Sequence, residues 1–116
     1  MNPMRFLLIA ILIVSASSLG RAHAFLDHAD PRVGSTVAAP ARVELWMTED
    51  LEPAFTKVQV FDSQGHEVDK QDAKISGATM VVSLPKLGPG TYLVKWKAVA
   101  TDTHRTTGTF KFTVQQ

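Results

Sequence analysis

The stretch TYLVKWKAV at residues 91–99 decides the fold, because polar and apolar side chains alternate along it. Alternation with a period of two is typical of a half-buried β-strand, in which successive side chains point to opposite faces. The predicted buried face carries Tyr92, Val94, Trp96 and Ala98. Lys95 and Lys97 fall on the opposite face, so this stretch predicts a strand between core and solvent.

Working outward from this strand, the same alternation recurs in short stretches separated by turn-forming residues. The stretches are ARVELWM (41–47), TKVQVF (56–61), ATMVVSL (78–84) and GTFKFTV (108–114). DSQG (62–65) and PKLGPG (85–90) read as turns, and no segment keeps a helical period. Further strands are expected around Phe25 and around residues 68–75. The pattern predicts an all-β fold: one small antiparallel β-sandwich or barrel with an immunoglobulin-like Greek key.

The first part of the chain reads as an export signal rather than as part of this domain. Arg5 precedes the apolar run FLLIAILIV (6–14), and the small-residue stretch SASSLGRA (15–22) follows it. The run is well short of the ~20 residues of a membrane-spanning helix, although an uncleaved anchor is the alternative. We therefore predict a signal peptide at residues 1–22 and an exported domain at residues 23–116, with no membrane span after cleavage.

Composition excludes several classes of function. The 116-residue chain has 12 basic and 11 acidic residues, and loss of Arg5 and Arg21 with the signal leaves no basic excess for nucleic acid. It has no cysteine, which removes thiolate metal sites and thiol nucleophiles. No nucleophile elbow and no phosphate-binding glycine loop is present, and the carboxylates of TEDLEP (48–53) read as a solvated loop. We expect a binding protein rather than an enzyme.

Histidines are the residues that indicate chemistry. His28 and His66 lie among polar neighbours and are expected on the surface, with a minor ligand role left open for His28. His104 follows Asp102 by two residues, so on an extended backbone both side chains would share one face and suit a divalent transition metal. An exposed loop pair with no metal is the alternative for Asp102 and His104.

His23 becomes important if the signal is cut just before it. Gly20 and Ala22 then satisfy the small-x-small rule, whereas a cut after Ala24 leaves Phe25 first and removes His23. The local sequence leaves both cuts open. A terminal histidine offers its α-amine and its ring Nδ1 to one metal. With Asp102 and His104 this makes three nitrogens and one carboxylate oxygen, a set that favours Cu(II), although ligand type alone does not exclude Zn(II).

The chain resembles the periplasmic copper-resistance protein C (CopC) family of copper-binding β-sandwiches. HAFLDHADPRVGS (23–35), VELWMTEDLEPAF (43–55) and LGPGTYLVKWKAVATDTHRTTGTFKFTV (87–114) carry the resemblance. It implies a Cu(II) site of His23, Asp102 and His104. It also implies an acidic position at Glu49 that lies near the metal in some members.

The chain departs from the family pattern at several positions. Some members have a methionine-rich Cu(I) site, but Met47 and Met80 fit core positions of strands, so we expect a Cu(II)-only member. Arg105 stands where many relatives have proline, which would place a positive charge near the metal. Trp46 and Trp96 are expected mainly in the core.

The resemblance implies a monomeric periplasmic protein that sequesters or delivers Cu(II) in copper resistance or homeostasis. Its partners would be the copper ion and an inner-membrane copper transporter or another periplasmic copper protein. Two alternatives remain: a metal-free immunoglobulin-like interaction module, favoured by a cut after Ala24, and a copper-dependent oxidase using the same histidine brace. The oxidase lacks support because the sequence supplies no extended aromatic surface for a substrate.

Overall fold

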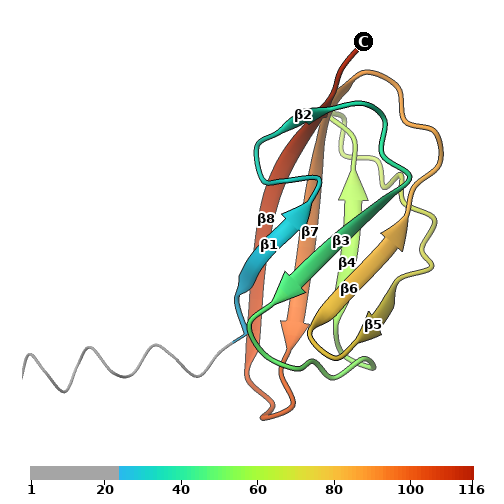
Figure 1. The fold of residues 1–116 in the computed structure, drawn as a ribbon. Coiled ribbons are helices and arrows are strands. Elements are labelled where there is room, and N and C mark those ends of the chain that lie inside the picture. Colours follow the sequence, from blue (N-terminus) through green and yellow to red (C-terminus); the bar gives the residue numbers. More distant parts are fainter. Residues whose placement is uncertain (1–23) are drawn as a thin grey trace, which may run out of the picture.

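The computed structural model describes residues 24–116, which form eight strands in two facing sheets and contain no helix within that range (Figure 1). The strands are β1 (Leu26–Asp30), β2 (Thr36–Val37), β3 (Arg42–Met47), β4 (Lys57–Phe61), β5 (Lys74–Ser76), β6 (Thr79–Ser83), β7 (Gly90–Val99) and β8 (Arg105–Val114). The four long alternating stretches outside residues 91–99 correspond to β3, β4, β6 and β8. Of the further strands expected, β1 and β5 are present, whereas β2 was not predicted.

Strand order gives the fold its immunoglobulin-like character. One sheet has the order β1-β3-β6-β5 and the other β2-β8-β7-β4. The chain crosses from one sheet to the other between successive strands from β1 to β5, whereas β5–β6 and β7–β8 are antiparallel pairs within one sheet. The predicted all-β sandwich is confirmed. All strand pairs are antiparallel except one, because β2 pairs in parallel with the end of β8.

Period-two alternation builds the core between the sheets. Tyr92, Val94, Trp96 and Ala98 of β7 are buried, as are Phe110, Phe112 and Val114 of β8. The two methionines of the sheets, Met47 and Met80, are buried as predicted. The expected core position of Trp46 is wrong, because Trp46 alternates with the buried Leu45 and Met47 and so points outward from β3, half-buried.

Two contacts fix β7 within the sandwich. The Tyr92 hydroxyl donates a hydrogen bond of 2.7 Å to the Gly88 carbonyl, the tyrosine corner of immunoglobulin-like sandwiches. The Trp96 ring lies over Gly108 on the paired strand β8, so closely that a Cβ at this position would come within 2.4 Å of the ring. Glycine at position 108 therefore makes room for the buried tryptophan.

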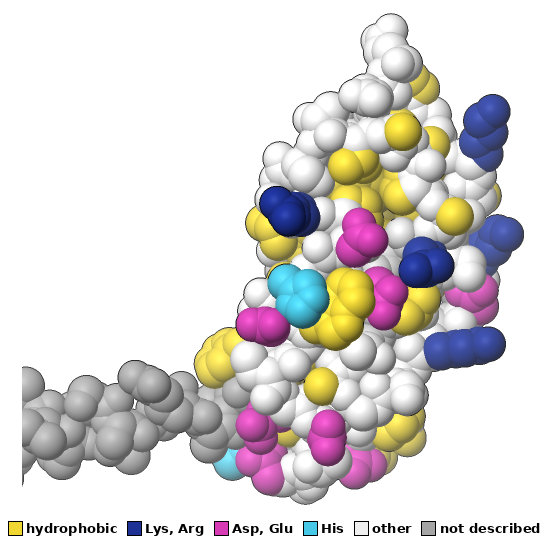
Figure 2. Space-filling view, in the orientation of Figure 1, with side chains coloured by type: hydrophobic (Ala, Val, Ile, Leu, Met, Phe, Trp, Pro, Cys, Tyr) yellow, Lys and Arg dark blue, Asp and Glu magenta, His cyan; other side chains and the backbone are white. Residues whose placement is uncertain are grey.

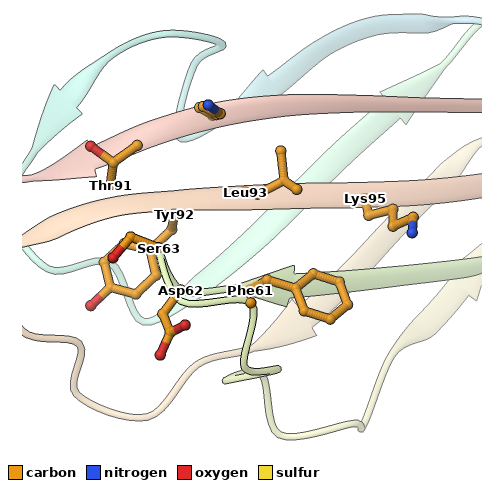
Figure 3. A pocket seen from close by; sticks show the side chains of 9 residues that line it. Phe61, Asp62, Ser63, Thr91, Tyr92, Leu93 and Lys95 are labelled. Atoms are coloured by element: carbon orange, nitrogen blue, oxygen red, sulfur yellow. The ribbon is translucent and has the colours of Figure 1, made fainter.

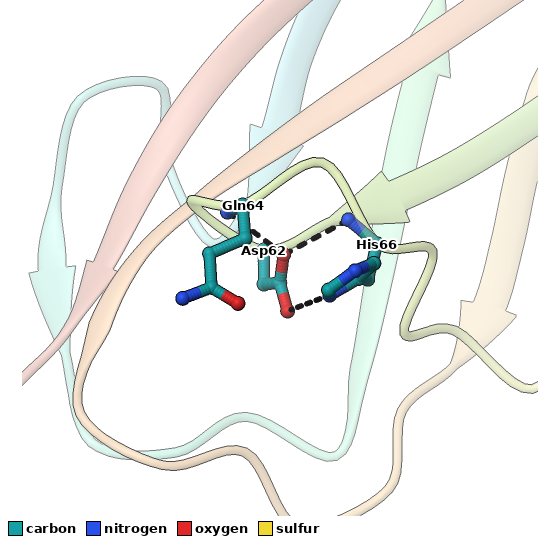
Figure 4. A network of polar contacts seen from close by, with 3 residues as sticks. All are labelled: Asp62, Gln64 and His66. Atoms are coloured by element: carbon teal, nitrogen blue, oxygen red, sulfur yellow. Dashed lines mark hydrogen bonds and ion pairs between the residues drawn. The ribbon is translucent and has the colours of Figure 1, made fainter.

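The predicted DSQG turn follows β4 and is held by one carboxylate (Figure 4). Asp62 Oδ1 accepts hydrogen bonds from the backbone N–H groups of Gln64 and His66, each at 2.9 Å. The hydrogen bond from the His66 N–H contributes most to holding the pKa of Asp62 below its usual value. Gly65 has a φ of 85° in this turn, a conformation that glycine adopts without steric cost.

Candidate metal centre

Three segments distant in the sequence meet at one end of the sandwich, the lower end in Figure 1. They are the β7–β8 turn, the loop that follows β3, and the residues that lead into β1. The backbone of the loop joins the turn, because Leu51 bridges to Ala100 and the Thr101 N–H donates to the Asp50 carbonyl at 3.1 Å. This end contains Asp102, His104 and Glu49.

The β7–β8 connection is a three-residue hairpin loop, Thr101 to Thr103. The Thr103 N–H donates to the Ala100 carbonyl at 2.8 Å, and the Ala100 N–H donates to the His104 carbonyl at 3.0 Å. Such loops require a left-handed residue after the turn, a position normally held by glycine. Here Thr103 occupies it with a φ of 75°, which is strained for a β-branched residue.

This loop brings Asp102 and His104 together. Asp102 Oδ1 accepts a hydrogen bond from the His104 backbone N–H at 3.1 Å, and Asp102 Oδ2 lies 3.1 Å from His104 Nδ1. The two side chains are about half-exposed. The expectation of an extended backbone is wrong: β8 begins only at Arg105, and the left-handed Thr103 turns the chain so that the carboxylate reaches the ring.

The residues before β1 are anchored beside this pair. Thr106, on β8 two residues after His104, donates a hydrogen bond from its hydroxyl to the Ala24 carbonyl at 2.6 Å. The Phe25 N–H donates to Thr48 Oγ1 at 2.9 Å, and the Thr48 N–H donates to the Phe25 carbonyl at 2.8 Å. The Ala24 side chain is fully buried in the core. The chain therefore enters the domain between β8 and the loop that follows β3.

Glu49 lies exposed on that loop, next to Thr48. Within residues 24–116, no three His, Asp or Glu side chains converge as a metal-binding group, so Glu49 does not join the Asp102–His104 pair in such a cluster. His23 and the predicted signal peptide at residues 1–22, with its two candidate cuts, lie outside the described residues.

The other two histidines of the described chain also pair with aspartates. His66 Nδ1 lies 3.5 Å from Asp62 Oδ2 in the β4–β5 connection, and both histidines are exposed as predicted. His28 Nδ1 lies 2.8 Å from Asp27 Oδ2, and its ring stacks on Trp46 with centroids 4.4 Å apart. In Figure 2 a histidine and a hydrophobic side chain lie side by side on this outer face of the β1-β3-β6-β5 sheet.

The loop end is acidic. Glu49, Asp50 and Asp102 are exposed there, and Figure 2 shows acidic side chains gathered over the loops at the lower end of the molecule. Arg105 is exposed at the start of β8, where its backbone pairs with Val99. Negative potential at this end favours an incoming cation, and Arg105 opposes it.

The Asp102–His104 pair suits a divalent metal in donor type and in spacing. Bonds of about 2.0–2.2 Å to two neighbouring ligands at a right angle place those ligand atoms about 3 Å apart. Asp102 Oδ2 and His104 Nδ1 are 3.1 Å apart. In the metal-free protein the same distance accommodates a hydrogen bond from the protonated Nδ1, so the pair offers two ligands of a larger set.

Three residues that position this end were not identified from the sequence. Thr48 and Thr106 hold the chain before β1, and Thr103 shapes the hairpin loop. A signal existed for Thr106, because it is an inward-facing polar residue in register with Phe110 and Phe112 on β8. No local signal marks Thr48 or the backbone conformation of Thr103.

Comparison with known proteins adds a family to this geometry. Residues 26–115 match the model of the CopC domain. The chain is 36% identical to copper resistance protein C of Pseudomonas syringae pv. tomato, over 85% of this chain and 86% of that protein. The crystal structure of CopC from Methylosinus trichosporium OB3b superposes with a TM-score of 0.75 at 33% identity, over 80% of this chain and 94% of that one.

One relative is much longer. The copper transport protein CutJ of Bacillus subtilis is 29% identical over 94% of this chain, but the match covers only 21% of that protein. Within residues 24–116 of the present chain, no helix is long and apolar enough to cross a membrane.

Proposed function

Because this chain belongs to the CopC family, we propose that it binds Cu(II) through His23, Asp102 and His104 once residues 1–22 have been removed. The family relation itself establishes a copper-related function. The proposal adds the oxidation state, the ligands and the processed N-terminus.

The observation that carries the proposal is the hydrogen bond from Thr106 to the Ala24 carbonyl. His23 is bonded directly to Ala24, and Thr106 of β8 lies two residues after His104 in the chain. The anchoring of Ala24 next to Thr106 supports a position of the mature N-terminus near the Asp102–His104 pair. Complete burial of Ala24 also supports the cut before His23, because a cut after Ala24 would remove a residue of the core.

As the first residue of the processed chain, His23 would supply two further ligands, its free α-amine and its ring Nδ1. The α-amine has an ordinary pKa of about 8, so a metal displaces its proton at modest cost near neutral pH. Amine, two imidazoles and the Asp102 carboxylate form an N,O donor set that suits Cu(II) more than other divalent ions. Glu49 adds negative charge from the neighbouring loop and is assigned to attracting the ion rather than to ligation.

Binding must release protons, because imidazole and amine ligands coordinate only in their neutral forms. When His104 Nδ1 is protonated, its proton faces Asp102 Oδ2, and the metal takes the place of that proton. Copper affinity is therefore expected to fall as the solution becomes more acidic. Cu(I) is not the expected cargo, because Met47 and Met80 are buried in the core.

In the proposed role the protein sequesters Cu(II) in the periplasm or delivers it to a transport protein, and it is not an enzyme. The chain matches about a fifth of the copper transport protein CutJ, which supports a transport protein as the partner of this domain. The partner would remove copper from an exposed site, since Asp102 and His104 are both about half-exposed.

The test is to recover the protein from the periplasm, determine its intact mass, and titrate it with Cu(II) by electron paramagnetic resonance. We expect chains that begin at His23, one Cu(II) per chain, and a spectrum with nitrogen ligands. Chains that begin at Phe25 would contradict the proposal and favour a metal-free interaction module. Chains that begin at His23 but give only the spectrum of free Cu(II) would contradict the ligand set.

A further inference from the structure

The outer face of the β2-β8-β7-β4 sheet is strongly basic. Lys57 of β4, Lys95 and Lys97 of β7 and Lys111 of β8 alternate with buried residues, so all four project from this face. We refer to these four residues as the lysine face. It lies on the side of the molecule opposite the His28–Trp46 stack.

The lysines are placed close together without ion-pair partners. Lys57 and Lys97 are directly opposite each other in the β4–β7 register, and Lys95 is two residues from Lys97 on the same face. Within residues 24–116, no salt bridge involves any of the four. Glu67 accepts a hydrogen bond from Gln59 of β4 at 3.3 Å, and it interacts electrostatically with Lys57 without forming an ion pair. Like charges in opposite positions destabilise a sheet, so an anion bound here would relieve repulsion.

Two hollows lie on this face and share Lys95. The first, of about 680 Å³, lies over β4, β7 and β8, and Phe61, Leu93 and Lys95 project around it (Figure 3). Its lining also includes Lys111 and the carboxylate of Asp62. The second, of about 420 Å³, is lined by Lys57, Lys95 and Lys97 with the hydroxyl groups of Thr107 and Thr109. Both volumes fall in the range of small-ligand sites, and both combine ammonium groups with hydroxyl groups.

The arrangement suits an extended anionic surface better than one small anion. Strands are about 4.8 Å apart and rise about 3.3 Å per residue, so the lysine face spans about 10 Å across the strands and about 13 Å along them. We propose that the lysine face docks on the headgroups of anionic phospholipids. Asp102 and His104 lie at the end of the strands rather than on this face, so docking leaves them uncovered.

The test uses the processed full chain with vesicles of phosphatidylcholine, with or without a quarter of phosphatidylglycerol, separated by sedimentation. We expect binding only to the anionic vesicles, weakening between 50 and 200 mM salt because exposed charges are screened. Each lysine near an anionic membrane contributes about fivefold in affinity. Lys95→Gln with Lys97→Gln is therefore expected to weaken binding about 25-fold.

The matched control is Lys74→Gln with Lys86→Gln, which changes net charge equally at exposed lysines outside this face. It should bind vesicles like the parent chain. Equal loss in both double variants would show a net-charge effect and overturn the assignment, as would equal binding to uncharged vesicles. Displacement by free glycerol phosphate, at the concentration of lipid phosphate, would assign the face to a small soluble anion and also overturn it. Copper titration of each variant tests the proposed copper site separately, because vesicle binding and copper binding are measured independently.

Discussion

Two turns of this molecule contain the same pair of residues but differ in their surroundings. The turn after β4 joins Asp62 to His66, and the β7–β8 turn joins Asp102 to His104. In both turns an aspartate Oδ1 accepts the backbone N–H of its histidine. Only the second turn lies beside the residues that precede β1, because Thr106 donates a hydrogen bond to the Ala24 carbonyl. An Asp–His pair is thus common here, and its place in the fold distinguishes the candidate copper site.

The largest expected difference between the two turns is in Cu(II) affinity after the histidine of each turn has been replaced by alanine. His104→Ala deletes a proposed ligand and should weaken Cu(II) binding by on the order of a hundredfold or more, since even outer-sphere changes at metal sites cost 10–100-fold. The matched variant His66→Ala should leave the affinity unchanged. Competition titration with a Cu(II) chelator measures both, and equal affinities for the two variants would remove the distinction between the turns.

Loosening the entry of the chain tests the feature that separates the two regions. Thr106→Val keeps the shape of the side chain but loses the hydrogen bond to Ala24, which contributes about 1 kcal/mol. We expect about fivefold weaker Cu(II) binding, and we expect the free energy of unfolding to fall by about 1 kcal/mol. Thr107→Val on the outward face of β8 is the control. Thr106→Val with unchanged copper affinity would show that anchoring Ala24 does not position the ligands.

Backbone strain also distinguishes the turns, because Thr103 is left-handed in one and Gly65 in the other. A left-handed conformation costs a non-glycine residue about 1–2 kcal/mol. Replacement by glycine removes this cost, but glycine loses more conformational entropy on folding, which cancels part of the gain. Thr103→Gly should therefore raise the unfolding free energy by about 0.5–1 kcal/mol. Gly65→Thr should lower it by about 1 kcal/mol. Thermal melts of the metal-free proteins report both, and a lower melting temperature for Thr103→Gly would contradict the strain.

Acid titration gives the smallest expected effect and concerns the turn after β4. The pKa of Asp62 is lowered in the folded protein, so its contribution to stability is present above its unfolded pKa and is lost as pH falls through the folded value. Asp62→Asn should lower the urea midpoint at pH 7 and have less effect near pH 3. An equal effect at both pH values would mean that the carboxylate charge does not stabilise the turn.

The sequence predicted the sandwich because its core residues alternate over long stretches, above all in β7 and β8. It did not predict β2, whose two residues are too short to show a period. Trp46 was misplaced because its size suggested burial, while its register directs it outward to stack with His28.

At the site, sequence reasoning placed Asp102 beside His104 for the wrong reason. The contact depends on the left-handed conformation of Thr103, and no side-chain pattern encodes that value of φ. The hydrogen bonds of Thr48 and Thr106 join residues 23 and 82 positions apart. Local periodicity marks Thr106 as an inward-facing polar residue but does not identify its partner, and it does not mark Thr48 at all. The ligand roles of His23, Asp102 and His104, and the proximity of Glu49 to the metal, stay predictions.

The most direct measurement compares Cu(II) affinity of the chain beginning at His23 with that of the same chain acetylated at its α-amine. Acetylation removes one proposed ligand and leaves Asp102, His104 and every strand of the sandwich intact. We expect 1:1 binding by the free amine and binding weaker by on the order of a hundredfold or more after acetylation. Equal affinities would show that the start of the mature chain does not take part in copper binding.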